Sequence, residues 1–153
     1  MQRMRWVYGL VFVLGGAAVA GCGDDDGTGT TGTLPMDMGT TSFRADVFPI
    51  IAANCAISGC HGSTRTSANL LMDTPDTAHA SLVDVEAMGG PCTEDSVARI
   101  RVVPGDPEAS LLVSKVTETP PDCGNPMPLA QPALSAADQA TITAWVAAGA
   151  VND

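Results

Sequence analysis

The sequence has 153 residues, and removal of an N-terminal signal of 21 residues leaves about 132, enough for one domain. Its 17 acidic residues outnumber its 7 basic residues and give a net charge of −10. This excludes a nucleic-acid binder, because contacts to phosphate depend on Lys and Arg. The negative charge favours a partner protein with a neutral or basic surface.

Only 28 of the 112 residues from Ser42 to Asp153 are Leu, Ile, Val, Phe, Met or Trp. The core is therefore thin, and we expect a covalent cross-link or a cofactor to support it.

The N-terminus has the pattern of a secretory signal. Two arginines, Arg3 and Arg5, precede an apolar run of fifteen residues from Trp6 to Ala20. A run of this length is short for a membrane span and typical of a signal peptide. The alternatives are an ordinary cleaved signal without lipid and an uncut membrane anchor.

The junction Val-Ala-Gly-Cys that ends at Cys22 resembles the lipobox of bacterial lipoproteins. The resemblance implies that residues 1–21 are a lipoprotein signal peptide and that Cys22 carries the lipid. It places the protein in the cell envelope, anchored by lipid to the periplasmic face of a membrane or at the cell surface. Gly23 stands where lipoproteins retained at the inner membrane tend to carry aspartate, which favours the outer membrane.

Residues 22–41 consist mainly of Gly, Thr and Asp, with almost nothing to bury. Such a composition predicts a flexible tether. The folded domain is therefore expected to span residues 42–153.

The first predicted helix begins at Thr41 or Ser42 and runs to Asn54, with a kink or a new turn at Pro49 because proline lacks the backbone N–H. A second short helix starts at Pro75 behind Thr74. The predicted buried positions of these two helices recur at helical spacing: Phe43, Val47, Ile50, Ile51, Ala78, Leu82 and Val83.

Farther along the chain, the β-branched segment 100–103 is expected to be extended. Asp106 is the predicted cap of a third helix that starts at Pro107. The last helix begins behind Ser135 and ends at Gly149. Its predicted buried stripe is Ala140, Ile142, Trp145 and Val146. The expected fold is all-α, with about four helices and long loops rich in Pro and Gly.

The segment from Asn54 to Gly62 carries the chemistry. Cys55 and Cys60 are followed directly by His61, a pattern related to covalent haem attachment, in which thiols add to the porphyrin vinyl groups and the imidazole ligates the iron. The usual motif has two residues between the cysteines, and this one has four. The glycine before Cys60 would allow the extra residues to bulge.

A second iron ligand is expected downstream. Met127 lies between Pro126 and Pro128, which hold it in an extended loop and can present its soft sulfur to iron. His79 is the alternative second ligand, although it is expected to be exposed on the second helix. Met72 and Met88 lack the proline frame.

Together these motifs resemble a single-haem c-type cytochrome domain of the kind carried by lipoproteins, including a Val-Pro-Gly-Asp-Pro segment that begins at Val103. The resemblance spans residues 43–150. It implies a cytochrome c-like fold with covalent haem c, attached at Cys55 and Cys60, with His61 as the proximal and Met127 as the distal ligand. Such domains pass single electrons to a redox partner and are not themselves enzymes.

Three further expectations depend on this resemblance. Once Cys55 and Cys60 hold haem, Cys92 and Cys123 remain to form a disulfide, as is usual in an oxidising compartment. Trp145 and Ile142 would pack near the edge of the porphyrin. Arg99 and Arg101 are candidate partners for its propionates.

Two other interpretations stay open. The first is a lipoprotein without cofactor, in which Cys55 and Cys60 form a second disulfide and the domain is a structural or interaction module. The second is a zinc site made of Cys55, Cys60, His61 and one further ligand. The sequence contains no other arrangement of residues that predicts catalysis.

Overall fold

A computed structural model of the chain describes residues 41–62 and 67–153. The predicted signal peptide 1–21, the predicted lipidation site Cys22 and the predicted tether up to residue 40 lie outside the described residues. Within the described part the fold is helical, with four α-helices and no β-strand. None of the helices in this part is long and apolar enough to span a membrane.

The first predicted helix is present, but it forms in two pieces, a π-helical turn (η1, Phe43–Val47) followed by α1 (Phe48–Asn54). Ser42 is the cap, as predicted, because its Oγ accepts from the amide of Ala45 at 3.2 Å. Pro49 is the second residue of α1 and has no N–H to donate to the preceding turn. The turn before it is wider than an α-helical turn, because the amide of Val47 donates to the carbonyl of Ser42, five residues back, at 3.2 Å.

Helix α2 (Pro75–Leu82) begins where the sequence predicted. Thr74 accepts from the amide of Thr77 at 3.2 Å, and the hydroxyl of Thr77 accepts from the amide of Thr74 at 3.0 Å, which makes a capping box. After α2 the chain pairs through isolated bridges with the segment 100–103, which the sequence predicted to be extended. The amide of Asp84 donates to the carbonyl of Val102 at 3.0 Å.

The predicted start of the third helix was wrong. Helix α3 (Leu111–Thr117) begins four residues after Pro107. Asp106 instead accepts from the amide of Ala109 at 3.0 Å in a separate turn. The cause is Ser110, whose buried hydroxyl accepts from the amide of Val103 at 2.8 Å and donates to the carbonyl of Asp106 at 2.7 Å. These bonds hold Ser110 in an extended conformation, so the helix starts after it.

Helix α4 (Ala136–Ala147) is confirmed at both ends. The Oγ of Ser135 accepts from the amide of Asp138 at 3.1 Å, and Gly149 has a φ of +105° just beyond the helix. Ile142, Trp145 and Val146 are buried as expected. Ala140 is exposed, so its predicted place in the buried stripe was wrong.

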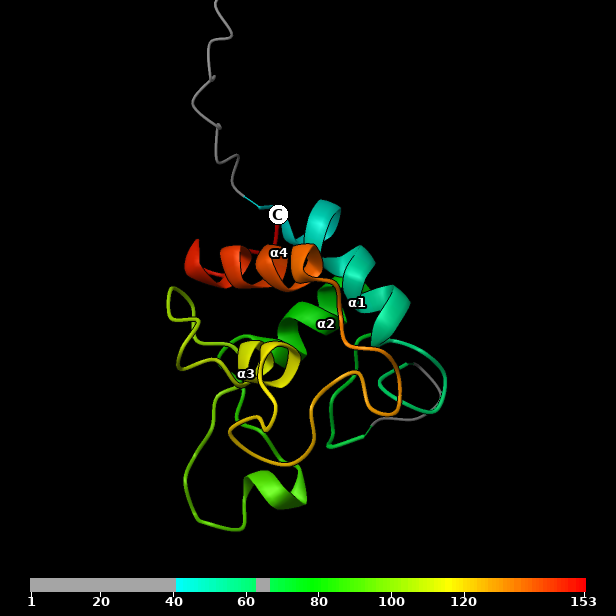
Figure 1. Ribbon diagram of the computed structural model, residues 1–153. Coiled ribbons are helices and arrows are strands. Elements are labelled where there is room, and N and C mark those ends of the chain that lie inside the picture. The colour runs from blue at the N-terminus through cyan, green and yellow to red at the C-terminus, as the bar shows by residue number, and fades with distance from the viewer. Residues whose placement is uncertain (1–40, 63–66) are drawn as a thin grey trace, which may run out of the picture. The chain divides into compact units, whose positions relative to one another are not determined.

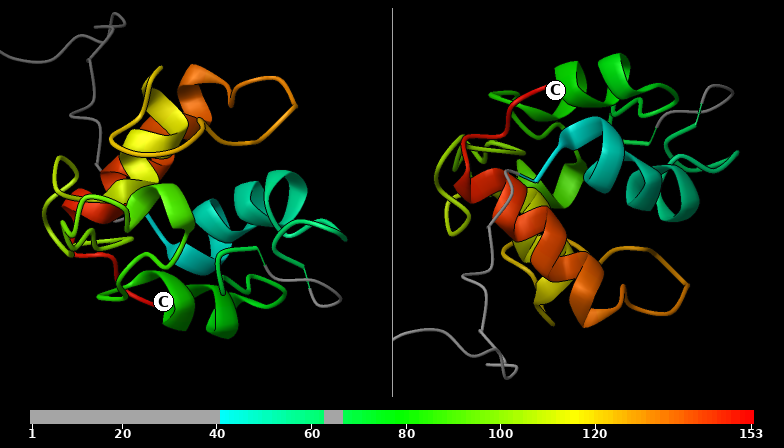
Figure 2. Two further views of the ribbon diagram at one scale, coloured as in Figure 1. Left: turned by 90° about the horizontal axis from the view of Figure 1, so that it is seen from below. Right: turned by 90° about the horizontal axis from the view of Figure 1, so that it is seen from above.

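The main core forms where the first helix and α3 pack against α4 (Figures 1 and 2). Phe43 and Trp145 lie at its centre, with ring centroids 4.9 Å apart. The last residue of the chain closes this end: the amide of Phe43 donates to the side chain of Asp153 at 2.8 Å, and the amide of Arg44 to its backbone oxygen at 3.0 Å. The largest fully buried apolar residues of the core are Trp145, Phe43, Ile51, Leu82, Ile142, Val47, Val102 and Val146.

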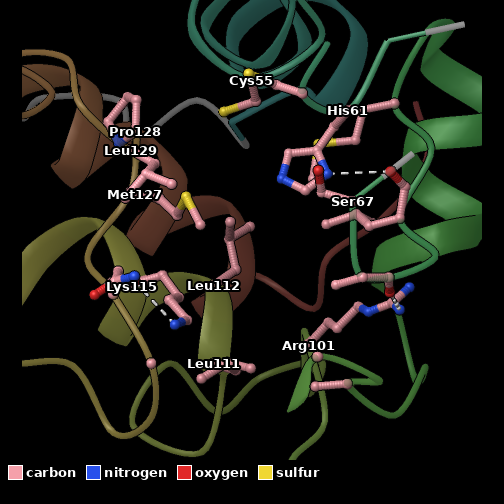
Figure 3. Close-up of a pocket in the computed structure, with 18 of the residues that line it drawn as sticks. Cys55, His61, Ser67, Arg101, Leu111, Leu112, Lys115, Met127, Pro128 and Leu129 are labelled. Atoms are coloured by element: carbon pink, nitrogen blue, oxygen red, sulfur yellow. Dashed lines mark hydrogen bonds between the residues drawn. The ribbon is translucent and has the colours of Figure 1, made fainter. Parts of the chain in front are cut away.

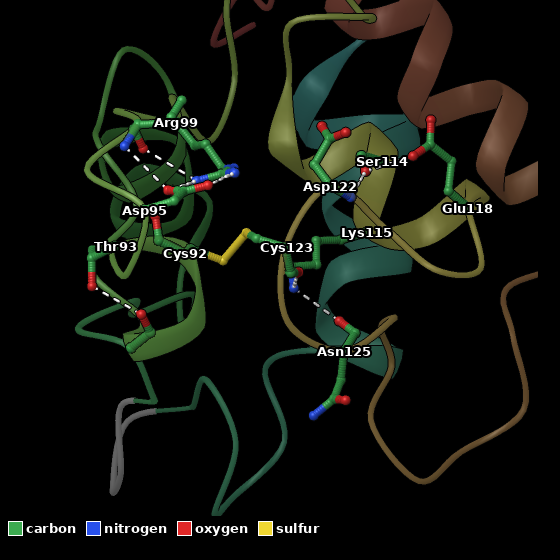
Figure 4. The surroundings of a disulfide bond; sticks show 12 residues. Cys92, Thr93, Asp95, Arg99, Ser114, Lys115, Glu118, Asp122, Cys123 and Asn125 are labelled. Atoms are coloured by element: carbon green, nitrogen blue, oxygen red, sulfur yellow. Dashed lines mark hydrogen bonds and ion pairs between the residues drawn. A yellow bond between two sulfur atoms is a disulfide. The ribbon is translucent and has the colours of Figure 1, made fainter.

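Cys92 and Cys123 form a disulfide (Figure 4). Both half-cystines belong to a smaller apolar cluster. The disulfide is the pairing that the sequence predicted. It joins the short helical turn η2 (Gly90–Cys92) to the loop that follows α3. Ala87 and Leu111 complete the cluster.

Candidate cofactor pocket

A cavity of about 350 Å³ lies beside the main core, within the size range of small-molecule sites. Its walls come from the C-terminal end of α1, the following cysteine segment, helix α3 and the loop after the disulfide. The walls are mostly aliphatic. The principal apolar residues that line it are Leu70, Met72, Leu82, Leu111, Leu112 and Val116.

This cavity brings together the four residues that the sequence assigned to one cofactor. Cys55, Cys60, His61 and Met127 all line it. Figure 3 shows Cys55 and His61 on one side of the space and Met127 across from them, with its sulfur directed inward. Residues far apart in the sequence therefore face a common volume.

The cysteine segment is a compact turn at the end of α1. The amide of Cys60 donates to the carbonyl of Ile57 at 3.1 Å, and the amide of His61 donates to the carbonyl of Cys55 at 3.2 Å. Gly59 has a φ of +88°, a conformation that favours glycine, and it allows the chain to reverse. The four intervening residues thus fold back on themselves, and His61 returns to the neighbourhood of Cys55.

Gly62 is part of this turn, although sequence reasoning gave it no role. A Cβ at this position would lie 2.7 Å from the carbonyl oxygen of Ala56 and 3.0 Å from that of Ile57. The backbone approaches so closely that no side chain fits. A glycine directly after Cys-His is a signal in the sequence that could have indicated this.

Both cysteines of the motif are free thiols in the structure, so the alternative disulfide between Cys55 and Cys60 is not formed. Burial, together with the neighbouring Cys60, raises the pKa of the Cys55 thiol to about 11. Cys55 is therefore protonated at neutral pH. Within residues 41–62 and 67–153, no group of three His, Cys, Asp or Glu side chains could hold a metal ion. The zinc alternative gains no support from them.

His61 has a fixed tautomer. Its Nδ1 lies 3.1 Å from the carbonyl oxygen of Leu70 and must donate, because a carbonyl can only accept. In the neutral ring the lone pair is therefore on Nε2, which Figure 3 shows directed toward the cavity. Burial lowers the pKa of His61, so the ring is neutral at pH 7. A neutral imidazole anchored through Nδ1 is the form that binds a metal through Nε2.

Among the described residues that line the cavity, Arg101 and Lys115 are the ones with a cationic side chain and none carries a carboxylate. Arg101 is 6% exposed. Its guanidinium donates to the carbonyls of Ser81 at 2.6 Å and Ala68 at 3.0 Å. An apolar cavity with two cations in its wall suits an amphipathic anion. Arg99, the other candidate partner for the propionates, does not line the cavity and is paired with Asp95.

Three other residues that the sequence associated with the cofactor lie away from this cavity. His79 does not line the cavity; its Nε2 donates to the carbonyl of Ala150 at 2.7 Å, and its ring contacts Phe43. Trp145 and Ile142 are core residues that also do not line the cavity. Met72 and Met88, which lack the proline frame, do line it. No local pattern in the sequence distinguishes them, because the extended loops that bring them there are set by tertiary contacts.

Comparison of the chain with protein-family models, curated protein sequences and solved structures gives no match. The site must therefore be judged on its own geometry. Two free thiols, a neutral imidazole and a thioether face one apolar cavity that also has two cations in its wall. This donor set fits a covalently attached iron porphyrin, whose ring is apolar, whose iron accepts nitrogen and sulfur, and whose propionates are negative.

Proposed function

We propose that this chain is a membrane-tethered electron-transfer protein with a single covalent haem c, and that its helical domain is cytochrome c-like. The observation that carries the proposal is the convergence of Cys55, Cys60, His61 and Met127 on one apolar cavity. A disulfide-stabilised module with no cofactor does not need these four side chains to face a common space.

Each of the chain's own residues has a defined part. Cys55 and Cys60 would hold the group through thioether bonds, and Nε2 of His61 and the sulfur of Met127 would supply the ligands of its iron. Arg101 would supply positive charge to the propionates. When bound, the haem supplies a one-electron couple whose potential depends on its ligands and on its exclusion from water.

The protein environment favours the reduced state of such a group. Thioether ligation would raise the potential relative to two imidazoles, and the aliphatic wall, which includes Leu112 and Val116, would make the surroundings of the group less polar. The two cations in the wall also disfavour an additional positive charge on the iron. These features match a carrier that accepts electrons readily and donates them to a partner.

The place of action follows from the N-terminus and the charge. Lipid on Cys22 and the tether 22–41 would hold the domain near a membrane of the cell envelope, with the outer membrane favoured. The net charge of −10 favours a redox partner whose surface is neutral or basic.

The decisive experiment is expression of the full chain with a cytochrome c maturation system. The product is expected to show a Soret band and to keep its haem in denaturing electrophoresis. In the oxidised protein, a weak sulfur-to-iron charge-transfer band at the red end of the visible spectrum is expected from Met127. A colourless product whose mass shows Cys55 joined to Cys60 would contradict the proposal and leave the cofactor-free lipoprotein.

Variants separate attachment from ligation. Met127→Ala is expected to abolish the charge-transfer band and keep the attached haem. Met88→Ala is the matched control, because Met88 also lines the cavity but is 62% exposed; it should leave the band unchanged. His61→Ala should prevent stable attachment. Loss of the band in the Met88 variant alone would assign the distal ligand to Met88.

The anchor is tested separately. Cys22→Ser is expected to release the protein from the membrane fraction or to stop its processing. A variant that is processed and remains membrane-bound would show that the anchor lies elsewhere in the chain, and would leave the haem proposal unaffected.

A further inference from the structure

Lys115 holds the segment that carries Met127 at three points. Its ammonium donates to the carbonyls of Cys123 and Asn125, the latter at 2.9 Å, and its own carbonyl accepts from the amide of Met127 at 2.8 Å. Figure 4 shows Lys115 beside Cys123 and Asn125. One residue of α3 therefore reaches both the start of the loop and the methionine itself.

The loop has little else to hold it. Within residues 124–133 of the described chain, every hydrogen bond that the structure shows is made with Lys115. The disulfide fixes the preceding residue, Cys123, and the next hydrogen bond along the chain is made by Leu134. Leu129, just beyond the methionine, is 55% exposed. Among the described residues, the side chain of Lys115 is therefore the one side chain that hydrogen-bonds the loop between the disulfide and Leu134.

The ammonium is suited to this task. Lys115 is half-buried, and the described residues offer it no ion pair, so its strongest partners are the two carbonyls. Hydrogen bonds from a charged donor are about twice as strong as neutral ones. A Cβ at position 124 would lie 3.0 Å from Nζ, and Gly124 has a φ of +60°. The loop therefore closes tightly around the amine.

We propose that Lys115 is the positioning residue for Met127: its ammonium orders the loop 123–129 and so presents the thioether to the cavity. This inference rests on the proposed function for the purpose of Met127, but the ordering of the loop can be measured without any cofactor. Lys115 is the one lysine of the sequence, which also makes it chemically addressable.

The experiment compares the wild type with two variants. Lys115→Met keeps the length and apolar stem of the side chain and removes the charged donor, whereas Lys115→Arg keeps the charge and the donors. In the cofactor-free protein, the amide of Met127 is expected to exchange its hydrogen about tenfold faster or more in Lys115→Met. Most of this protection should return in Lys115→Arg. Amides of α4 are the internal reference and should not change.

The haem-loaded protein supplies a second readout. Lys115→Met should keep its attached haem but lose most of the charge-transfer band that Met127 provides, and Lys115→Arg should regain it. Acetylation of Lys115 in the folded wild type removes the charge without a mutation and should act like Lys115→Met. This covers the case in which the methionine variant does not fold.

The outcomes separate this inference from the proposed function. If the Met127 amide exchanges its hydrogen at the wild-type rate in both Lys115→Met and the acetylated protein, Lys115 does not position Met127. An unchanged charge-transfer band in Lys115→Met would overturn this positioning role as well. If the wild type takes up no haem, the proposed function fails, while faster exchange in Lys115→Met still supports the ordering of the loop by Lys115.

Discussion

The turn that brings His61 back to Cys55 requires a residue without a side chain at Gly62. Because a Cβ at this position would overlap the carbonyl oxygen of Ala56 at 2.7 Å, Gly62→Ala is expected to destabilise the domain by about 1–3 kcal/mol. It should also lower the yield of attached haem, because the adjacent Cys60-His61 pair must move. Urea denaturation of the cofactor-free protein measures the first effect and the Soret absorbance the second.

The matched control for this prediction is Gly90→Ala. A Cβ on Gly90 would meet nothing within 4 Å, and the φ of Gly90 lies outside the left-handed region. This variant should have nearly wild-type stability and haem content. Equal stability of the two variants would show that the turn can open without cost.

Asp76 should contribute to the sensitivity of the domain to acid. A hydrogen bond from Asn152, together with the neighbouring Arg44, lowers the pKa of Asp76 below its ordinary value of 3.8. As the pH falls through 3.8 the unfolded chain therefore binds the proton first, and stability is lost below that pH. Asp76→Asn should flatten this part of the stability profile, measured by urea denaturation between pH 5 and about pH 2.5.

Glu108→Gln is the control for Asp76→Asn. Glu108 is exposed and takes part in no hydrogen bond or ion pair among the described residues. Its substitution should leave the loss of stability at low pH as it is in the wild type. If Asp76→Asn shows this same loss of stability, the acid sensitivity comes from other carboxylates. Because Asp76 is on the surface, salt should also weaken its contribution.

At the level of single residues, the sequence predicted those features of the site that depend on adjacent residues. Cys60 and His61 are adjacent, so their joint presence at the cavity followed from the motif. The role of Lys115 did not, because its partners Cys123 and Asn125 come eight and ten residues later and are reached only after the loop has folded back. A lysine at helical spacing is otherwise typical of a solvated face.

The helices differ in how close together in the sequence the residues lie that fix where each helix begins. The start of α4 follows from Ser135 and Asp138, which lie three residues apart and satisfy each other. The start of α3 depends on Ser110, whose hydroxyl bonds to Val103 across a turn. The first kind of signal can be read from a short window of sequence. The second needs the tertiary structure, and Asp106 was therefore mistaken for the cap.

The cap of α4 gives a prediction at this scale. Ser135→Ala removes the acceptor for the amide of Asp138 and is expected to destabilise the domain by about 1 kcal/mol. Ser135→Asn retains an oxygen acceptor and should recover most of the loss. Thermal denaturation followed by circular dichroism compares the three proteins. A fully stable alanine variant would mean that packing of Trp145 alone fixes the helix.

Across the whole domain, the three aromatic residues of the described part went to the core and not to the cavity. Trp145 and Phe43 pack against each other, and the indole N–H donates to the carbonyl of Val151 at 2.9 Å. Composition indicated correctly that large apolar residues are scarce. Composition does not determine whether these residues lie in the main core or in the cavity. The cavity is lined mainly by Leu and Met side chains instead.

The disulfide is expected to contribute much of the stability of so thin a core. Cys92 and Cys123 are 31 residues apart, and closing such a loop is worth about 3.7 kcal/mol on the chain-entropy model. The double variant Cys92→Ser with Cys123→Ser should therefore show a much lower urea midpoint. Reduction of the wild type should match the variant. If the urea midpoint of the double variant equals that of the oxidised wild type within error, the disulfide contributes nothing measurable and packing of the helices accounts for the stability.

The contact of Asp153 with the first helical turn makes the backbone of the folded domain almost a closed ring. The two ends meet at the hydrogen bonds to Phe43 and Arg44, whereas the cavity is lined by residues between Asn54 and Gln131. A mechanical load applied through the two ends would therefore act first on these bonds and on the core beneath them. The stretch of chain that builds the cavity lies wholly inside the ring, and the same topology makes the domain a natural candidate for circular permutation.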